Sequence, residues 1–278
     1  MKFLCVGVVT YGVLCAAEPK PDPMELPRIP HTPVAKARET FEVKPGFDLQ
    51  LAAAEPLVAD PIAMSFDAHG RLYVVEMIGY SERREANAGR IRRLEDTDGD
   101  GRFEKSVVFA DGLAWPTAVI CYNGGVFVGV TPKILFLKDT TGDGKADVNR
   151  TVLEGFGTGR SRLNVQAMFN SFRWGLDNRI HGCTSYMGGS VKDAAGNTVS
   201  LSGRNFSFDP RTLQLRGEDS TAQHGMSFDD AGRKFTCSNS SHLQALMYPS
   251  RYAGRNPHYA LPSQRVGIAA DGAAAEVF

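Results

Sequence analysis

The chain lacks an excess of charge of either sign. Lys and Arg together number 31 among its 278 residues, as do Asp and Glu, so the formal net charge is zero. Proteins that bind nucleic acid or anionic membranes over a broad surface carry an excess of basic residues, so the sequence disfavours both classes. Hydrophobic residues make up 42% and charged residues 22%, which is typical of a globular protein.

Several catalytic signatures are also missing. The sequence has no Gly-x-Ser-x-Gly, no His-Glu-x-x-His and no Walker loop, the marks of α/β-hydrolases, zinc proteases and P-loop NTPases. It has no Cys-x-x-Cys-His, so it does not carry a c-type haem.

Long apolar runs are rare, and the one of note begins the chain. A positive start, Met1-Lys2, precedes the mostly apolar run from Phe3 to Leu14 and the small residues Ala16 and Ala17. This pattern predicts a secretory signal peptide over residues 1–17 and a secreted or periplasmic mature chain with no membrane span. An uncleaved anchor is the alternative, although the run is short for a bilayer.

A hairpin pattern recurs with a fixed period. Four segments each place a short apolar strand on either side of a turn, and their turn residues are Gly70, Gly124, Asn178 and Gly232. The spacings are 124 − 70 = 54, 178 − 124 = 54 and 232 − 178 = 54. Repeats of strands without 3.6-residue periodicity favour propeller blades over helical repeats.

Weaker strand pairs follow these hairpins. Acidic loops join the strands of two such pairs, around residues 91–110 and 134–153, and a third pair lies near 205–216. The sequence therefore predicts an all-β fold, a β-propeller of four-stranded antiparallel blades, incomplete at about four to five blades over residues 41–278. A Pro-rich leader is expected over 18–40, a first strand pair over 41–52, and a long loop over 238–262.

Three cysteines follow the predicted signal peptide. Cys183 and Cys237 are 54 residues apart, so they occupy one repeat position, and the third is Cys121. A disulfide between the first two and a set of buried thiols are both compatible with this spacing.

Two loops have spaced oxygen ligands. Asp96, Asp98, Asp100 and Glu104 occupy positions 1, 3, 5 and 9 of an EF-hand-like loop, with Gly at position 6, and the second loop offers Asp139, Asp143 and Asp147. Hard cations such as Ca²⁺ need several oxygens at once, so we predict structural Ca²⁺ in these loops. A solvated acidic turn is the alternative.

The repeat also predicts where a ligand would bind. Residues 62, 116, 170 and 224 are equivalent and begin the innermost strands, which in propellers surround one mouth of the channel. His224 is the candidate general base there. The candidate cofactor-binding residues are polar or cationic and lie on the neighbouring loop and strand: Arg160, Arg162, Asn164, Gln166 and Arg173.

A family resemblance rests on these motifs. PIAMSFDAHGRLYVVE, the two acidic loops, NSFRWGLDNRIHG and GMSFDDAGRKFTCSNS resemble the propeller domain of the membrane-bound dehydrogenase proteins of the PVC-type haem-binding group. Those propellers are similar to the quinoprotein glucose/sorbosone dehydrogenases. The resemblance covers roughly residues 41–278.

The resemblance implies oxidation of a sugar or alcohol with a pyrroloquinoline quinone (PQQ) cofactor and a cytochrome c domain or protein as electron acceptor. Ala167 stands where the quinoprotein dehydrogenases carry a catalytic histidine. The alternative is a non-catalytic, Ca²⁺-stabilised propeller that binds glycans or partner domains.

Overall fold

The computed structural model describes residues 30–159, 163–253, 255–256 and 258–270. The predicted signal peptide, Arg160, Arg162 and residues 271–278 lie outside this part. The chain divides after Gln50 into two compact units, and each is described by itself.

The first unit, up to Gln50, contains little regular structure in its described part. A one-turn helix α1 (Val34–Ala37) continues into the 3₁₀ turn η1 (Arg38–Thr40), and Arg38 forms an ion pair with Asp48. The strand pair that we predicted over 41–52 is not formed. Phe41 and Phe47 are exposed, and a turn at Pro45–Gly46 interrupts the segment, so neither strand gains a packed face.

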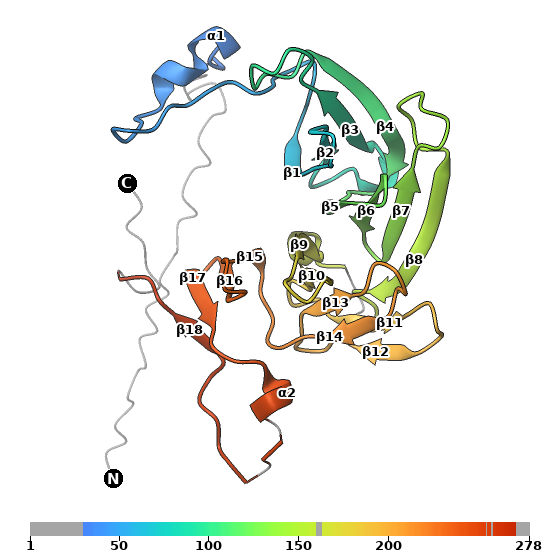
Figure 1. Cartoon of the computed structure of the whole chain (residues 1–278), viewed down its shortest axis with the longest axis vertical. Helices are drawn as coiled ribbons and strands as arrows, with labels where there is room; N and C mark the ends of the chain where they lie inside the picture. The colour runs from blue at the N-terminus through green and yellow to red at the C-terminus, as the bar shows by residue number, and fades with distance from the viewer. Residues whose placement is uncertain (1–29, 160–162, 254, 257, 271–278) are drawn as a thin grey trace, which may run out of the picture. The chain divides into compact units, whose positions relative to one another are not determined.

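The second unit is built of antiparallel strands, as the repeat predicted (Figure 1). The strands are β1 (Pro61–Phe66), β2 (Leu72–Glu76), β3 (Gly89–Glu95), β4 (Lys105–Leu113), β5 (Ala118–Tyr122), β6 (Gly125–Val130), β7 (Lys133–Lys138), β8 (Val148–Phe156), β9 (Asn170–Trp174), β10 (Ile180–Cys183), β11 (Gly189–Lys192), β12 (Thr198–Ser200), β13 (Phe206–Phe208), β14 (Leu215–Gly217), β15 (His224–Phe228), β16 (Lys234–Ser238), β17 (Ser241–Leu246) and β18 (Arg265–Gly267). Short helical turns are η2 (Arg84–Ala86), η3 (Val165–Ala167) and α2 (Ser250–Ala253).

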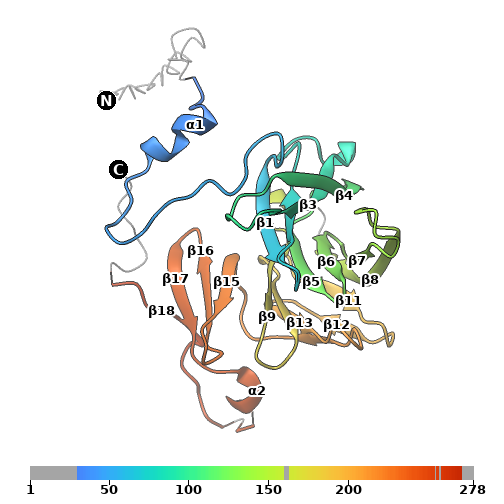
Figure 2. The same cartoon turned by 45° about the horizontal axis from the view of Figure 1, so that its top comes forward.

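These strands form four sheets. The first sheet has the order β1-β2-β3-β4, the third β9-β10-β13-β14 and the fourth β15-β16-β17-β18, whose strands lie side by side in Figure 2. The second sheet, β5-β6-β7-β8, gains the hairpin β11–β12 at its outer edge. The innermost strands contact one another in the order β1, β5, β9, β15. This is the arrangement of consecutive propeller blades and confirms the predicted fold class.

The 54-residue repeat has a local cause. All four turn residues of the inner hairpins have a left-handed backbone, with φ of 75° at Gly70, 73° at Gly124, 58° at Asn178 and 74° at Gly232. Gly adopts this conformation without strain and Asn does so more readily than most residues. The turn chemistry therefore fixes each hairpin, and the alternating strands supply the faces that stack.

The core lies in the seams between sheets. Tyr73, Val75 and Phe109 are buried in the first seam, where the first and second sheets meet. Phe127, Phe172 and Phe208 are buried in the second seam, where the second and third sheets meet. Burying one such side chain contributes about 2–3 kcal/mol. The seam between the third and fourth sheets has a much smaller buried apolar cluster, Cys183, Ala222 and Met226.

The long loop that we predicted over residues 238–262 is wrong in its first part. Ser241–Leu246 forms β17, which pairs with β16. The alternation of apolar and polar residues in this strand is weak, since Leu243 is exposed. Cys121, Cys183 and Cys237 are free thiols, so the disulfide between the last two is not formed; Cys183 is buried, whereas Cys121 and Cys237 are only partly buried. Burial raises the pKa of Cys183 to about 12.

No helix in the described ranges is long and apolar enough to cross a membrane.

Candidate functional site

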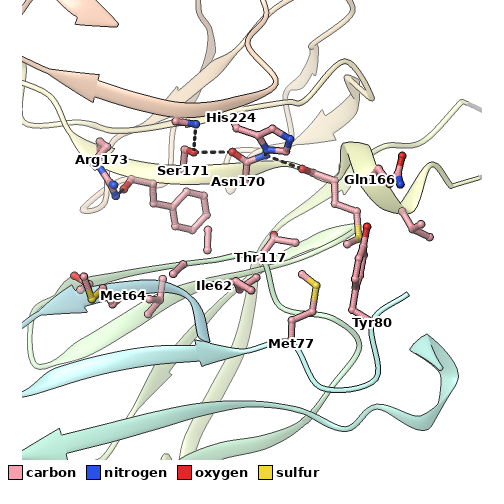
Figure 3. Close-up of a pocket in the computed structure, with 18 of the residues that line it drawn as sticks. Ile62, Met64, Met77, Tyr80, Thr117, Gln166, Asn170, Ser171, Arg173 and His224 are labelled. Carbon is pink, nitrogen blue, oxygen red and sulfur yellow. Dashed lines mark hydrogen bonds between the residues drawn. The ribbon is translucent and has the colours of Figure 1, made fainter. Parts of the chain in front are cut away.

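A large cavity lies where the innermost strands begin. It has a volume of about 820 Å³, and its lining comes from all four sheets (Figure 3). Ile62, Asn170 and His224, which the 54-residue repeat made equivalent, line it together, and Thr117 represents the second sheet. Three of the four equivalent positions thus line one pocket, and the fourth, Pro116, does not.

One wall of this channel pocket is apolar. Ile62, Met64 and Phe66 project from alternate positions of β1, with 49%, 62% and 59% of their surface exposed. They are uncovered because the intervening face of β1 packs on β5, where Ser65 Oγ accepts a hydrogen bond from the Cys121 amide at 3.2 Å. Such a wall suits the apolar face of a ring-shaped ligand.

The opposite wall is polar (Figure 3). Asn170 Nδ2 donates to the carbonyls of Met168 at 3.0 Å and Gln223 at 2.9 Å, while its Oδ1 accepts from Ser171 Oγ at 2.6 Å. Ser171 Oγ also accepts from the Gly225 amide at 3.1 Å. These bonds join β9 to β15 and hold the polar groups in place.

His224 stands at this wall with an uncommitted ring nitrogen. Its Nδ1 lies 3.4 Å from Asn170 Nδ2, but that amide already uses both protons at shorter distances. The imidazole is open to solvent on one side and desolvated by the pocket on the other, and this partial burial lowers its pKa. It is therefore neutral near pH 7, which is the state a general base needs.

The predicted cofactor-binding residues divide into three groups. Gln166 and Arg173 line the pocket, and Arg173 donates to the Phe172 carbonyl at 2.8 Å, which leaves other N–H groups for a ligand. Asn164 instead caps η3 by accepting from the Gln166 amide at 3.1 Å and does not line the pocket. Arg160 and Arg162 lie outside the described residues.

Two lining residues were missed in the sequence. Met77 and Tyr80 follow β2, and the Tyr80 ring packs on Trp115 with ring centroids 5.3 Å apart. Positions 131 and 134, one repeat later, hold Thr and Ile, so the repeat carried no signal for these two residues. Ala167, where a histidine was expected by resemblance, is buried in η3 and presents no functional group.

The first acidic loop brings its carboxylates together. One oxygen from each of Asp96, Asp98, Asp100 and Glu104 lies within 4.8 Å of the others. Amides of Gly99 and Gly101 donate to Asp96 and lower its pKa, so it is ionised at neutral pH. Four clustered carboxylates fit the oxygen donor set of Ca²⁺.

The second loop forms no such cluster among the described residues. Its candidates were Asp139, Asp143 and Asp147. Asp139 instead faces the guanidinium of Arg93 at 3.5 Å, and both side chains are nearly buried. The positively charged Arg93 side chain thus lies beside Asp139, where a metal ion would have to bind, and this weakens the prediction of a second Ca²⁺ site.

Sequence comparison identifies the family. A family described as "Domain of unknown function (DUF7133)" matches residues 33–278. The chain belongs to the DUF7133 family. None of the curated proteins matches it in sequence.

Solved structures show a distant likeness to this DUF7133 chain. A protein from Lactobacillus plantarum is 18% identical, with a TM-score of 0.44 over 72% of this chain and 54% of its own. The PQQ domain of pyranose dehydrogenase from Coprinopsis cinerea is 14% identical, with a TM-score of 0.43 over 66% and 44%. PQQ-bound aldose sugar dehydrogenase from Streptomyces coelicolor is 13% identical, with a TM-score of 0.44 over 68% and 59%. The chain spans about half the length of these structures.

Proposed function

We propose that the channel pocket binds a sugar or alcohol together with a PQQ-type cofactor and that the protein acts as a quinoprotein-like dehydrogenase. The observation that carries the proposal is the convergence of a neutral histidine, a cation and hydroxyl-binding side chains opposite an apolar wall. Polyols present both an apolar ring face and hydroxyl groups, and this pocket offers a surface for each.

The described residues have the chemical character that a planar, anionic quinone needs, namely polar and cationic groups for its carboxylates and side chains that can pack on its ring. Its carboxylates would meet Arg173 and Gln166, and its ring would lie against the side chains of Met77 and Tyr80. A bound PQQ-type quinone supplies the acceptor for the substrate's hydride. Arg160 and Arg162 remain proposed as further cofactor contacts.

The protein's own part in the reaction is to hold the substrate and take its proton. Asn170 and Ser171 fix the polar wall, and substrate hydroxyls would bind beside them. His224 would accept the hydroxyl proton as the C–H bond breaks. We further propose secretion with cleavage near Ala17, and a cytochrome c domain or protein as the electron acceptor.

The experiment is a titration with PQQ and Ca²⁺ followed by absorbance and thermal shift, then a sugar and alcohol screen with a reducible dye. We expect saturable PQQ binding and substrate-dependent dye reduction. His224→Gln should lower kcat by about a hundredfold and leave PQQ binding intact. The matched control is His69→Gln, an exposed histidine in the β1–β2 turn. Absence of PQQ binding by the folded protein would contradict the proposal.

One observation favours a second function, a non-catalytic binding propeller. No carboxylate among the described residues lines the channel pocket, so His224 has no acidic partner there to orient it. Under this alternative, glycans or partner domains bind and protect the protein thermally without PQQ, and dye reduction stays at background for every substrate.

A further inference from the structure

A second cavity lies in the seam between the third and fourth sheets. Its volume is about 380 Å³, and it is formed at the opposite ends of β9 and β15 from the channel pocket. Asp177 and His181 come from the third sheet, and Phe228 and Lys234 from the fourth. The two cavities share no lining residue.

Three side chains in this seam cavity form a hydrogen-bonded relay. Lys234 Nζ lies 3.3 Å from His181 Nδ1, and His181 Nε2 lies 3.0 Å from Asp177 Oδ1. An ammonium group only donates, so Nδ1 is the acceptor and the ring proton resides on Nε2, which donates to Asp177. Lys234 is thus placed as a nucleophile, His181 as its base and Asp177 as the group that orients the base. This is the pattern of an activated nucleophile.

The relay is well ordered by its surroundings. His181 is only 5% exposed, and its ring packs edge-on against Phe228 with centroids 5.2 Å apart. The hydrogen bond from His181 lowers the pKa of Asp177 to about 2, so this carboxylate is ionised throughout the physiological range. The imidazole therefore has one fixed orientation and a permanent acceptor.

Lys234 is desolvated. Its ammonium lies 5.4 Å from the Phe228 ring centre, and burial lowers its pKa in spite of the acidic groups Asp177, Glu218 and Asp219 nearby. The Cys183 thiol, whose pKa is about 12, is neutral, and Arg233 is held by Asp229 at 2.6 Å. A larger share of Lys234 is thus neutral near pH 7 than for a solvated lysine.

The seam itself is less tightly filled with apolar atoms than the other two. Thr236 Oγ1 and Gln244 Oε1, neighbours on β16 and β17, are buried and have no hydrogen-bond partner among the described residues.

We propose that Lys234 is a nucleophilic amine and that the seam cavity binds small aldehydes, which it captures as imines. The Nζ–carbon bond forms as the carbonyl π bond breaks, and the carbon–oxygen bond then breaks to release water. His181 takes one proton from the Lys234 ammonium before attack, and a second nitrogen proton passes to the carbonyl oxygen to give the carbinolamine hydroxyl. His181 then returns its proton to that hydroxyl, which leaves as water, and the product is the protonated imine. Asp177 is a positioning residue, since it acts through His181.

The test is reductive trapping with propanal and sodium cyanoborohydride, with propylation measured by peptide mass spectrometry. The exposed Lys192 on β11 is the internal reference. At pH 7 we expect Lys234 to be labelled faster than Lys192, because burial lowers the pKa of Lys234 and His181 can accept its proton. Equal or slower labelling of Lys234 at pH 7 overturns the proposal.

Variants separate the relay from simple desolvation. His181→Asn should slow labelling of Lys234 by about a hundredfold, and Asp177→Asn should slow it as well. Removing the Asp177 charge by itself lowers the pKa of Lys234, so faster labelling in Asp177→Asn would mean that the relay does not operate. Asp67→Asn is the matched control and should label as the wild type does, because Asp67 makes the equivalent ion pair with Arg71 in the first inner hairpin and does not line the seam cavity. Thermal melts confirm that each variant is folded, and the wild-type ratio tests the proposal without any variant.

Discussion

The two acidic loops share a backbone and differ in what neutralises them. Asp96 accepts from the amides of Gly99 and Gly101, and Asp139 accepts in the same way from those of Gly142 and Gly144. The last acid of each loop, Glu104 or Asp147, accepts from the amide and hydroxyl of a threonine. Local sequence therefore dictates one loop conformation twice.

The difference is a cation from the neighbouring sheet. Arg93 of β3 reaches across the first seam to the second loop, where a Cβ placed on Gly144 would lie 2.9 Å from its guanidinium. The first loop has a fourth carboxylate, Asp98, where the second has Thr141. The carboxylate of the second loop is thus neutralised by Arg93, and the first loop has the oxygen donor set for a metal ion.

The largest expected effect is a response to Ca²⁺ that depends on the first loop. At a hundredfold excess of Ca²⁺ over its Kd, Tm should rise by about 5 °C, and a chelator should reverse the rise. Asp98→Thr, which makes the first loop resemble the second, should abolish most of it. Asp143→Asn in the second loop is the control and should keep the full response. Differential scanning calorimetry measures all three, and an unchanged Ca²⁺ response in Asp98→Thr would contradict the assignment.

Breaking the arginine contact should have a smaller effect. Arg93→Met removes the cation from Asp139, which is nearly buried, and also from Glu95, which Arg93 contacts at 2.9 Å, so the free energy of unfolding should fall by about 1–3 kcal/mol in urea titrations. Arg211→Met is the control, because Arg211 pairs with Asp209 at the surface and its loss should lower the free energy of unfolding much less. Equal losses would show that the Arg93 contact is no stronger than a surface pair.

The double variant Arg93→Met/Thr141→Asp tests the comparison in reverse. It removes the competing cation and adds a fourth carboxylate, so the second loop should gain its own Ca²⁺ response. Isothermal titration calorimetry should then show one more bound ion than in Arg93→Met. Binding of an extra ion by Thr141→Asp with Arg93 intact would mean that the arginine does not exclude a metal.

The smallest effect is a common sensitivity to acid. Hydrogen bonds lower the pKa of Glu104 and Asp96 from 4.5 and 3.8, and those of Asp139 and Asp147 from 3.8. The unfolded chain then binds more protons, so this stability is complete above pH 4.5 and is lost as the pH falls below it. Tm should decline over that window in both Ca²⁺-free wild type and Asp98→Thr. A Tm that stays constant or rises on acidification would be the contrary result.

Much of the fold was predictable because its determinants are local. The left-handed turn residues Gly70 and Gly232, each followed by an arginine bonded to the aspartate that opens the turn, mark hairpins over four or five residues. The attachment of β11–β12 to β8 was not predictable, since it joins a hairpin of the third repeat to the second sheet. The strand with which this hairpin pairs depends on which sheet edge remains unpaired once the sheets have stacked.

The candidate site was predictable in part for the same reason. Repeat phase placed Asn170 and His224 at one mouth, but Met77 and Tyr80 belong to a loop outside the repeat, and Asn164 serves as a cap. No spacing rule links Asp177 and His181 to Lys234, which comes from the next sheet.

The sequence by itself determined the hairpins, their 54-residue period and the shape of both acidic loops, because backbone conformation follows from neighbouring residues. The tertiary structure decided which loop meets Arg93, which walls of the channel are apolar, and that a lysine meets a histidine across a seam. Those outcomes depend on charges and side chains from different sheets, and only the stacking of the sheets brings them within reach of one another.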